Sequence, residues 1–226
     1  MCQLETGGIL YAFLEQDCSD ERSTQMTAII DYGAGNIKSV EKALLSLGQE
    51  VVITDDKETI LNADRIILPG VGAFGDAMAQ LEKTGLDVVI REAVEKNIPF
   101  LGICLGLQLL FEKSEEAPGV KGLGILKGEV KKIPAEQGLK IPHMGWNSLH
   151  FAHDGKLFHG IEEGSYVYFV HSYYLKAEEE FIVKASTEYG VSIHASVEKD
   201  NVFACQFHPE KSSETGLKIL KNFVQL

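Results

Sequence analysis

The sequence predicts an α/β fold, with a mostly parallel central sheet, helices on both faces of that sheet, and antiparallel strands added in the C-terminal half. Three observations predict this class. Between residues 27 and 111, short apolar segments alternate with segments whose apolar residues recur every three or four positions. Glycine-rich loops follow two of the apolar segments, and beyond residue 128 short strand-like segments predominate. Strands that alternate with helices usually form a parallel sheet covered on both sides, from which the fold class follows.

Composition narrows the class of protein. A chain of 226 residues is long enough to bury one full hydrophobic core. The formal net charge of −12 argues against nucleic acid as a ligand and is compatible with a small polar substrate or a basic partner surface. No apolar run reaches the ~18 residues that a membrane span needs. The four cysteines, at positions 2, 18, 104 and 205, lack the spacing of metal ligands and the density of a disulfide framework. We therefore expect a cytoplasmic protein with neither a metal nor another cofactor.

Residues 1–25 differ from the rest of the chain. Their apolar stretch, from Ile9 to Leu14, is short and is preceded by an acidic residue rather than a basic one, which does not fit a secretory signal peptide. We expect a leader of unknown role. It could be an additional helix, a disordered segment, or the product of an upstream start codon with Met26 as the functional start. Residues 26–226 are predicted to form a single domain.

The first half of this domain contains the segments predicted to form the parallel sheet. Apolar residues recur at helical spacing from Ile37 to Leu47, and Gly48 ends that helix, since glycine is favoured just past a helix C-terminus. The predicted strands are 28–31, 51–53, 65–68 and 99–103, and the predicted helices are 37–47, a short one before residue 65, 76–83, 86–96 and 105–111. Ligands of such sheets bind at the carboxyl ends of the strands, and Cys104 follows one of these ends.

The second half contains five strand-like segments, which we expect to add antiparallel strands to the main sheet. They are 129–133, 166–170, 181–185, 189–195 and 202–207. Leu217, Leu220 and Phe223 then recur at helical spacing and predict a closing helix.

Residues 102–106 match the G-x-nucleophile-x-G elbow, with Cys104 at the nucleophile position. A strand that turns sharply into a helix holds its nucleophile in strained backbone, and Gly102 and Gly106 lack the Cβ atoms that would collide there. The N-terminus of the following helix favours a thiolate, and the N–H of Leu105 is free to bind an oxyanion. The same residues also fit a buried structural cysteine in a glycine-containing turn, so a catalytic interpretation requires a base.

His208 is the candidate base. Residues 202–208 alternate as a strand, in which Ala204, Gln206 and His208 share one face, and Pro209 should end the strand pairing because it cannot donate a hydrogen bond. If the chain stays extended, Glu210 projects to the same side as His208 and can orient its ring. Cys104, His208 and Glu210 then form a nucleophile, base and orienting carboxylate.

Residues 70–75 match G-x-G-x-x-G between a predicted strand and a helix, which is the fingerprint of dinucleotide binding. That fingerprint also requires an acidic residue about 20 positions on, at the end of the next strand, but this region is predicted to be helical. We favour a different interpretation, in which Gly70 and Gly72 let backbone N–H groups approach a substrate oxygen.

Several motifs together resemble the class I (triad) glutamine amidotransferases. The elbow GICLGLQ at 102–108 and HPE at 208–210 carry the general resemblance. Three further stretches, DYGAGN at 31–36, PGVGAF at 69–74 and PHMGWN at 142–147, are similar to the glutaminase subunits of imidazole glycerol phosphate synthases, as is Lys211 directly after the triad glutamate. The resemblance runs from about residue 27 to the C-terminus, and it implies that 26–226 is a glutamine amidotransferase domain.

The resemblance implies that Cys104 attacks the side-chain amide of L-glutamine, that His208 transfers protons and that Glu210 orients His208. Glutamate and ammonia are then released through a thioester. The N–H groups of Val71 and Leu105 would hold the oxyanion. The residues implied around glutamine are Gly70, Gly72, Gln108, Ser172 and Tyr173.

Ammonia needs an acceptor, and the resemblance implies a partner protein, a (βα)8-barrel cyclase that forms a heterodimer with this chain. The cyclase would use the ammonia to make imidazole glycerol phosphate and an aminoimidazole-carboxamide ribotide in histidine biosynthesis. The residues implied to face or gate this partner are Asn36, Trp146, Tyr168 and Lys211.

Three other interpretations compete with this one. The chain could be the glutaminase subunit of another amidotransferase, a peptidase or glyoxalase-like enzyme with a cysteine elbow, or a non-catalytic scaffold subunit of the same fold. The peptidase and glyoxalase interpretations leave residues 208–210 and 142–147 unexplained, and an intact triad argues against a scaffold.

Overall fold

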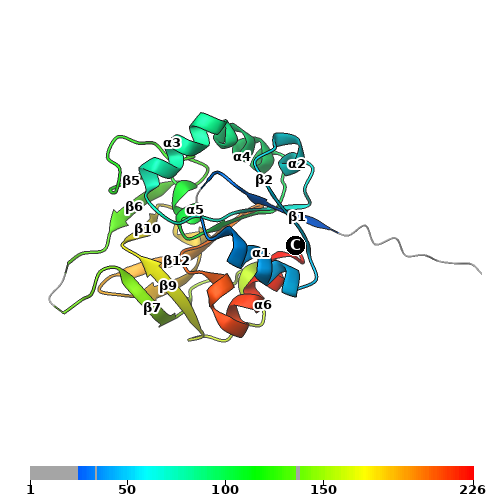
Figure 1. Cartoon of the computed structure of the whole chain (residues 1–226). Helices are drawn as coiled ribbons and strands as arrows, with labels where there is room; N and C mark the ends of the chain where they lie inside the picture. The colour runs from blue at the N-terminus through cyan, green and yellow to red at the C-terminus, as the bar shows by residue number, and fades with distance from the viewer. Residues whose placement is uncertain (1–24, 34, 136–137) are drawn as a thin grey trace, which may run out of the picture.

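A computed structural model of the chain describes residues 25–33, 35–135 and 138–226 (Figure 1). The expected leader over residues 1–25 therefore lies outside the described residues, apart from Gln25. Gln25 accepts a hydrogen bond from Arg65, and Arg65 also donates to the carbonyl of the C-terminal Leu226. The start of the described chain is thereby joined to its end.

The main sheet has eight strands in the order β2-β1-β3-β4-β13-β12-β11-β8. The strands are β1 (Met26–Ile30), β2 (Glu50–Thr54), β3 (Arg65–Leu68), β4 (Phe100–Ile103), β8 (His150–Phe151), β11 (Val183–Glu188), β12 (Ser192–Lys199) and β13 (Val202–Cys205). The pairs from β2 to β13 are parallel, and those from β13 to β8 are antiparallel. The predicted fold class, a mostly parallel sheet with antiparallel strands added, is confirmed.

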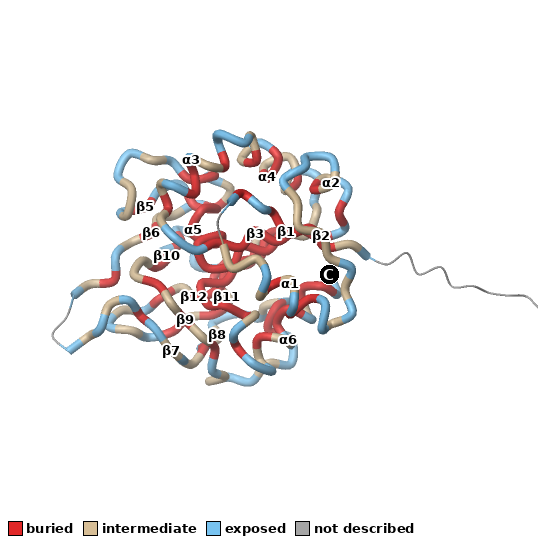
Figure 2. Tube along the Cα trace, in the orientation of Figure 1, coloured by how far each residue is buried: buried red, intermediate tan, exposed pale blue. Residues whose placement is uncertain are grey.

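Helices cover both faces of this sheet. They are α1 (Ile37–Ser46), α2 (Lys57–Leu61), α3 (Phe74–Thr84), α4 (Leu86–Glu95), α5 (Leu105–Leu109) and α6 (Ser213–Phe223). In β1, Ala28 and Ile30 pack with α2 to α5 on one face, while Ile29 packs with α1 and α6 on the other. Figure 1 shows these two layers, and Figure 2 shows that the strands between them are buried. The alternation of apolar side chains along each strand produces this two-sided core.

Two further small sheets account for the strands that do not join the main sheet. One has the order β10-β6-β5, from Tyr173–Ala177, Gly128–Lys132 and Lys113–Ser114, and the other is a ribbon of β7 (His143–Ser148) and β9 (Tyr166–His171). The expectation that segments 129–133 and 166–170 extend the main sheet was therefore wrong. Segment 202–207 does join the main sheet, but one of its two neighbours, β4, is parallel to it. Periodicity along a segment predicts its conformation but not its pairing partner.

In two helices, a carboxylate side chain binds a backbone N–H group of the first turn and so fixes where the helix begins. Asp56 caps α2, because its carboxylate accepts a hydrogen bond from the backbone N–H of Thr59 at 2.8 Å. The carboxylate of Glu116, distant in sequence, accepts from the N–H of Phe74 at 2.8 Å, and α3 begins at Phe74, two residues before the predicted start. Glu116 is thereby held beside the glycine loop that precedes α3.

Candidate active site

The strand-to-helix elbow places Cys104 between the end of β4 and the start of α5. Its backbone is in the left-handed region, with φ 54°, a conformation that costs a non-glycine residue about 1–3 kcal/mol. A Cβ atom on Gly106 would lie 1.9 Å from the carbonyl oxygen of Leu68, and one on Gly102 would lie 2.8 Å from the carbonyl oxygen of Gly106. The backbone of β4, β3 and α5 is thus too close for any side chain at these two positions, as the elbow motif predicts.

His208 and Glu210 lie just beyond β13, where the chain turns. His208 Nδ1 is 2.8 Å from Glu210 Oε1, and both side chains are buried. The expected extended chain after His208 is wrong: residues Pro209–Lys211 form a 3-10 turn (η3), closed by a hydrogen bond from the Lys211 N–H to the His208 carbonyl. Proline fixes φ and cannot donate to a strand, and the resulting turn brings the carboxylate back to the ring.

The pKa of His208 is raised from 6.5 to about 9. Burial by itself lowers this pKa, but Cys104 and the Glu210 carboxylate together outweigh burial and raise it. Since Nδ1 is bound to Glu210, Nε2 is the ring nitrogen left for the thiol, and it makes no other hydrogen bond within the described part of the chain. The raised pKa means that the environment of the buried ring favours its protonated form, and an imidazolium in this cavity would attract a thiolate.

A cavity of about 290 Å³ opens onto Cys104 and His208. Its walls also contain Val71, Gly72, Leu105, Gln108, Glu116, Val170, His171, Ser172 and Tyr173. The structure thus brings most residues of the predicted glutamine site together. Gly70 lies behind this wall, where a Cβ atom would be 2.7 Å from the Tyr32 hydroxyl. Glu116 was missed because, in sequence, it cannot be distinguished from a solvated charge.

The two expected oxyanion donors do not converge in this structure. The N–H of Leu105 donates to the carbonyl oxygen of Gly70, with an N···O distance of 3.4 Å. In a trans peptide the N–H of the next residue points opposite to the carbonyl, so the N–H of Val71 points away from Leu105. Gly72, next in the loop, has φ 105° and gives this backbone conformational freedom.

The four residues predicted to face a partner lie on or next to elements grouped around η3: β9 and α1 contact η3, and β7 pairs with β9. Trp146 on β7 lies opposite Tyr168 on β9, with ring centroids 6.2 Å apart, and Trp146 is 52% exposed. The backbone N–H of His208 donates to the Tyr168 carbonyl at 2.9 Å, which attaches this ribbon to the triad. Lys211 is exposed in η3, and the half-buried Asn36 precedes α1, which packs against η3.

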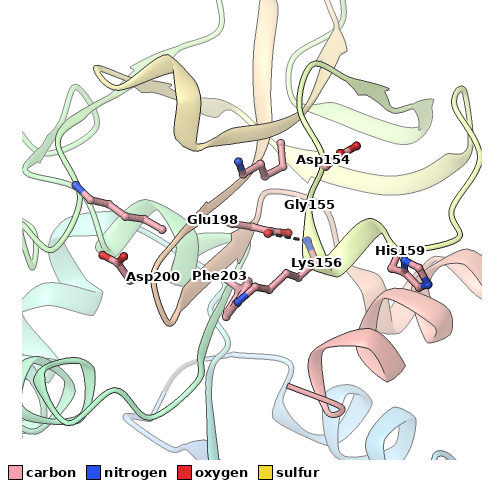
Figure 3. Close-up of a pocket in the computed structure, with 9 residues that line it drawn as sticks. Asp154, Gly155, Lys156, His159, Glu198, Asp200 and Phe203 are labelled. Carbon is pink, nitrogen blue, oxygen red and sulfur yellow. Dashed lines mark hydrogen bonds between the residues drawn. The ribbon is translucent and has the colours of Figure 1, made fainter.

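A second, larger cavity of about 610 Å³ lies where the chain enters β13 (Figure 3). Because β13 and β4 are parallel, this end of the sheet is opposite to the one that Cys104 follows. Three of its charged side chains have partners within the protein. Glu198 accepts hydrogen bonds from the N–H groups of Lys156 and Leu157, Lys199 pairs with Glu179, and Lys184 donates to a backbone carbonyl. The Glu198 contacts hold the loop at residue 156 against β12, which is a structural role, so we place the chemistry in the smaller cavity.

The described residues contain no group of three or more His, Cys, Asp or Glu side chains placed to hold a metal ion. None of the helices in residues 25–33, 35–135 and 138–226 has the length and apolar character required to cross a membrane.

The sequence of the chain matches one family model and is similar to several known proteins. The family model for class-I glutamine amidotransferases matches residues 28–226. The imidazole glycerol phosphate synthase subunit HisH of Moorella thermoacetica is 56% identical, over 88% of this chain and 94% of its own length. The subunit HisH of Caldanaerobacter subterraneus is 57% identical, over 89% of this chain and 98% of its own length. The subunit HisH of Aquifex aeolicus is 56% identical, over 87% of the chain and 95% of its own length.

Solved structures share the fold at low sequence identity. The structure of PurLQS from Thermotoga maritima matches with a TM-score of 0.70 and 22% identity, over 89% of this chain and 98% of that one. The crystal structure of a glutamine amidotransferase from the same organism matches with a TM-score of 0.62 and 17% identity, over 89% of this chain and 81% of that one.

Proposed function

The chain belongs to the class I glutamine amidotransferase family, and from this premise we propose that it hydrolyses L-glutamine to L-glutamate and ammonia as the glutaminase subunit of an imidazole glycerol phosphate synthase, in histidine biosynthesis. The observation that carries the proposal is the triad: the strained Cys104 shares a cavity with His208, whose Nδ1 is 2.8 Å from Glu210. Identities of 51–57% to HisH subunits do not favour another amidotransferase or a scaffold.

In the proposed reaction the Cys104 sulfur attacks the amide carbon of glutamine. The imidazolium of His208 gives its proton to the departing ammonia, then takes a proton from the water that hydrolyses the thioester, while Glu210 holds the ring. The negative oxygen formed at each attack requires N–H donors. The Gly70–Val71 peptide must rotate so that the N–H groups of Leu105 and Val71 both face that oxygen. In its present orientation the Gly70–Val71 peptide occupies the Leu105 N–H with its carbonyl, and this would cause low activity in the isolated chain.

Glutamine also carries an ammonium and a carboxylate that the site must accommodate. Glu116 is the acidic side chain that lines the cavity, and it is held in place by the N–H of Phe74. We assign it to the substrate ammonium, because an anion at a fixed position pairs with a cation. Gln108, Ser172 and Tyr173 line the same cavity and remain the proposed contacts for the other polar atoms, with Gly70 and Gly72 shaping the wall.

The released ammonia requires a partner. The names of the relatives describe subunits of a synthase, so we propose a complex with the cyclase, a (βα)8 barrel that receives ammonia in a heterodimer. The exposed Trp146 and Lys211, with Tyr168 and Asn36, support a docking surface beside the triad. The cytoplasm remains the proposed location, on the basis of cysteine usage.

The test is glutamate production from glutamine by the purified chain, alone and with the cyclase and its nucleotide substrate. We expect activity that rises strongly with the partner and is lost in Cys104→Ala. Equal activity with and without the partner would contradict the synthase assignment, and no wild-type activity in either state would contradict the glutaminase itself.

A further inference from the structure

Gln206 is a fully buried polar residue next to the nucleophile. It follows β13, and its backbone N–H donates to the carbonyl of Ala195 at 2.8 Å, which extends the pairing with β12 by one residue. Its side chain lies between Gln108 and Cys104: the Gln206 Oε1 atom is 3.1 Å from Gln108 Nε2, and the Gln206 Nε2 atom is 3.7 Å from the Cys104 sulfur.

The orientation of both amides follows from one backbone carbonyl. Gln108 Nε2 is 3.0 Å from the carbonyl oxygen of Tyr173, which can only accept a hydrogen bond, so this atom must be nitrogen. The same nitrogen contacts Gln206, so the atom of Gln206 that faces it must be the oxygen. The nitrogen of Gln206 is then the atom that faces the sulfur. A rotation of the Gln206 amide would place two donors together and would break this chain of hydrogen bonds.

Two chemical consequences follow. An N–H group aimed at the sulfur favours the thiolate, because a donor is bound more strongly by a charged acceptor than by a neutral one. The two N–H bonds of Gln108 are both occupied, by Tyr173 and by Gln206, so Gln108 can offer the cavity only its oxygen. An acceptor in that position selects a ligand that carries N–H donors, as glutamine does.

We propose that Gln206 is a positioning residue for this reaction: its amide N–H holds the Cys104 sulfur as a thiolate, and its amide oxygen fixes Gln108 so that the Gln108 oxygen receives the N–H groups of the substrate. The proposal rests on the proposed function, since it assigns a substrate to the cavity. Its first part concerns the sulfur alone and can be measured without glutamine.

Two variants separate the two roles. Gln206→Met keeps the length of the side chain and removes both polar atoms. Gln206→Glu keeps an oxygen that accepts from Gln108 and replaces the N–H with an oxygen that repels a thiolate. The matched control is Ser196→Ala on the neighbouring strand, since Ser196 is also fully buried and its hydroxyl donates to the carbonyl of Ala204.

The first measurement is the rate at which iodoacetamide alkylates Cys104 as a function of pH, with the site identified by peptide mass spectrometry and folding checked by thermal unfolding. We expect the midpoint of the pH profile to lie about one unit higher in both variants, so that the rate falls about tenfold at any pH well below the wild-type midpoint, since one unit corresponds to a tenfold change in ionisation. The control should keep the wild-type profile. If one variant does not fold, the other decides.

The second measurement is glutaminase activity with the partner present. We expect Gln206→Met to raise KM for glutamine and lower kcat, and Gln206→Glu to lower kcat with KM near that of the wild type. Wild-type alkylation profiles in both variants would overturn the proposal, as would a KM in Gln206→Met equal to that of the control. A wild-type protein without glutaminase activity would instead refute the proposed function, while the alkylation profiles would still decide whether Gln206 acts on the sulfur.

Discussion

Cys104 and His208 each hold a state that is unfavourable for an isolated residue. Cys104 has a positive φ, and the pKa of His208 is raised to about 9 although its side chain is only 2% exposed. Burial lowers this pKa, but Cys104 and the Glu210 carboxylate outweigh burial. The surroundings therefore maintain both states, and changing one neighbour should alter them measurably.

Glu210→Gln should lower the free energy of unfolding by an amount that depends on pH. A group whose pKa rises on folding contributes stability that is fully present below its unfolded value of 6.5 and is lost as the pH rises through about 9. We expect the variant to unfold more easily by about 1–3 kcal/mol between about pH 5 and 6.5, with a smaller difference above pH 9. Urea unfolding across this pH range measures it.

Glu163→Gln is the matched control, because His150 and Glu163 also form a pair at 2.9 Å, although both side chains are exposed. Solvent screens such a pair, and the pKa of Glu163 is lowered by the hydrogen bond from the Phe151 N–H and by His150, so the carboxylate is ionised above about pH 5. This variant should therefore change the free energy of unfolding little, and without pH dependence, between about pH 5 and 9. A loss in Glu210→Gln that does not depend on pH would contradict the assigned charge on His208.

At the scale of elements, the site depends on how closely α5 approaches the sheet. The start of α5 lies against the end of β3, where the Leu68 carbonyl occupies the space that a Cβ on Gly106 would need. This approach aligns the elbow with the glycine loop after β3, so that Leu105 and Gly70 are in hydrogen-bond contact. A displacement of the helix would therefore move Leu105 away from Gly70 and shift Cys104 with it.

Gly106→Ala should lower the free energy of unfolding by about 3 kcal/mol or more, because a methyl group 1.9 Å from a backbone oxygen forces the helix to move. Chemical denaturation measures the loss. Gly75→Ala in α3 is the control: its Cβ would lie 3.2 Å from the Ala117 side chain, and alanine favours a helix. We expect that variant to stay within about 1 kcal/mol of the wild type, and equal midpoints for both variants would contradict the argument.

At the scale of the whole molecule, the β7-β9 ribbon stands beside the main sheet and presents an aromatic surface. Met144, Trp146 and Tyr166 are all more than half exposed on this ribbon. The ribbon is hydrogen-bonded to His208 through Tyr168 and contributes to the cavity wall through Val170 and His171. A partner bound there would lie against both the triad and the substrate site.

Trp146→Ala should weaken binding of the cyclase by about thirtyfold, or about 2 kcal/mol, as expected of a central aromatic at an interface. The free energy of unfolding of this variant should differ from that of the wild type by less than about 1 kcal/mol, because the Trp146 side chain is 52% exposed. Titration calorimetry with the partner measures the affinity. Phe181→Ala, at an aromatic residue that is 61% exposed and lies outside the ribbon, should bind like the wild type. Equal affinities for both variants would place the interface elsewhere.

Local sequence patterns were sufficient to predict the alternation of strands and helices, the glycines of the elbow and the residues of the candidate triad. Each of these depends on neighbours in the chain. Apolar periodicity selects strand or helix, and a cysteine between Gly102 and Gly106 requires a sharp turn. The chain at Glu210 is not extended as expected, yet its carboxylate still lies 2.8 Å from His208 Nδ1, because Pro209 limits the turn to a few conformations.

The pairing of the strands, the position of Glu116 and the contacts of Gln206 could not be predicted from local patterns and required the folded structure. Segments 129–133 and 166–170 have strand periodicity, yet they form separate sheets, since pairing depends on the packing of the whole chain. The contacts of Gln206 with Gln108 and Cys104 span 98 and 102 residues of sequence. Such contacts leave no local pattern, because the energy that forms them comes from burial in a common core.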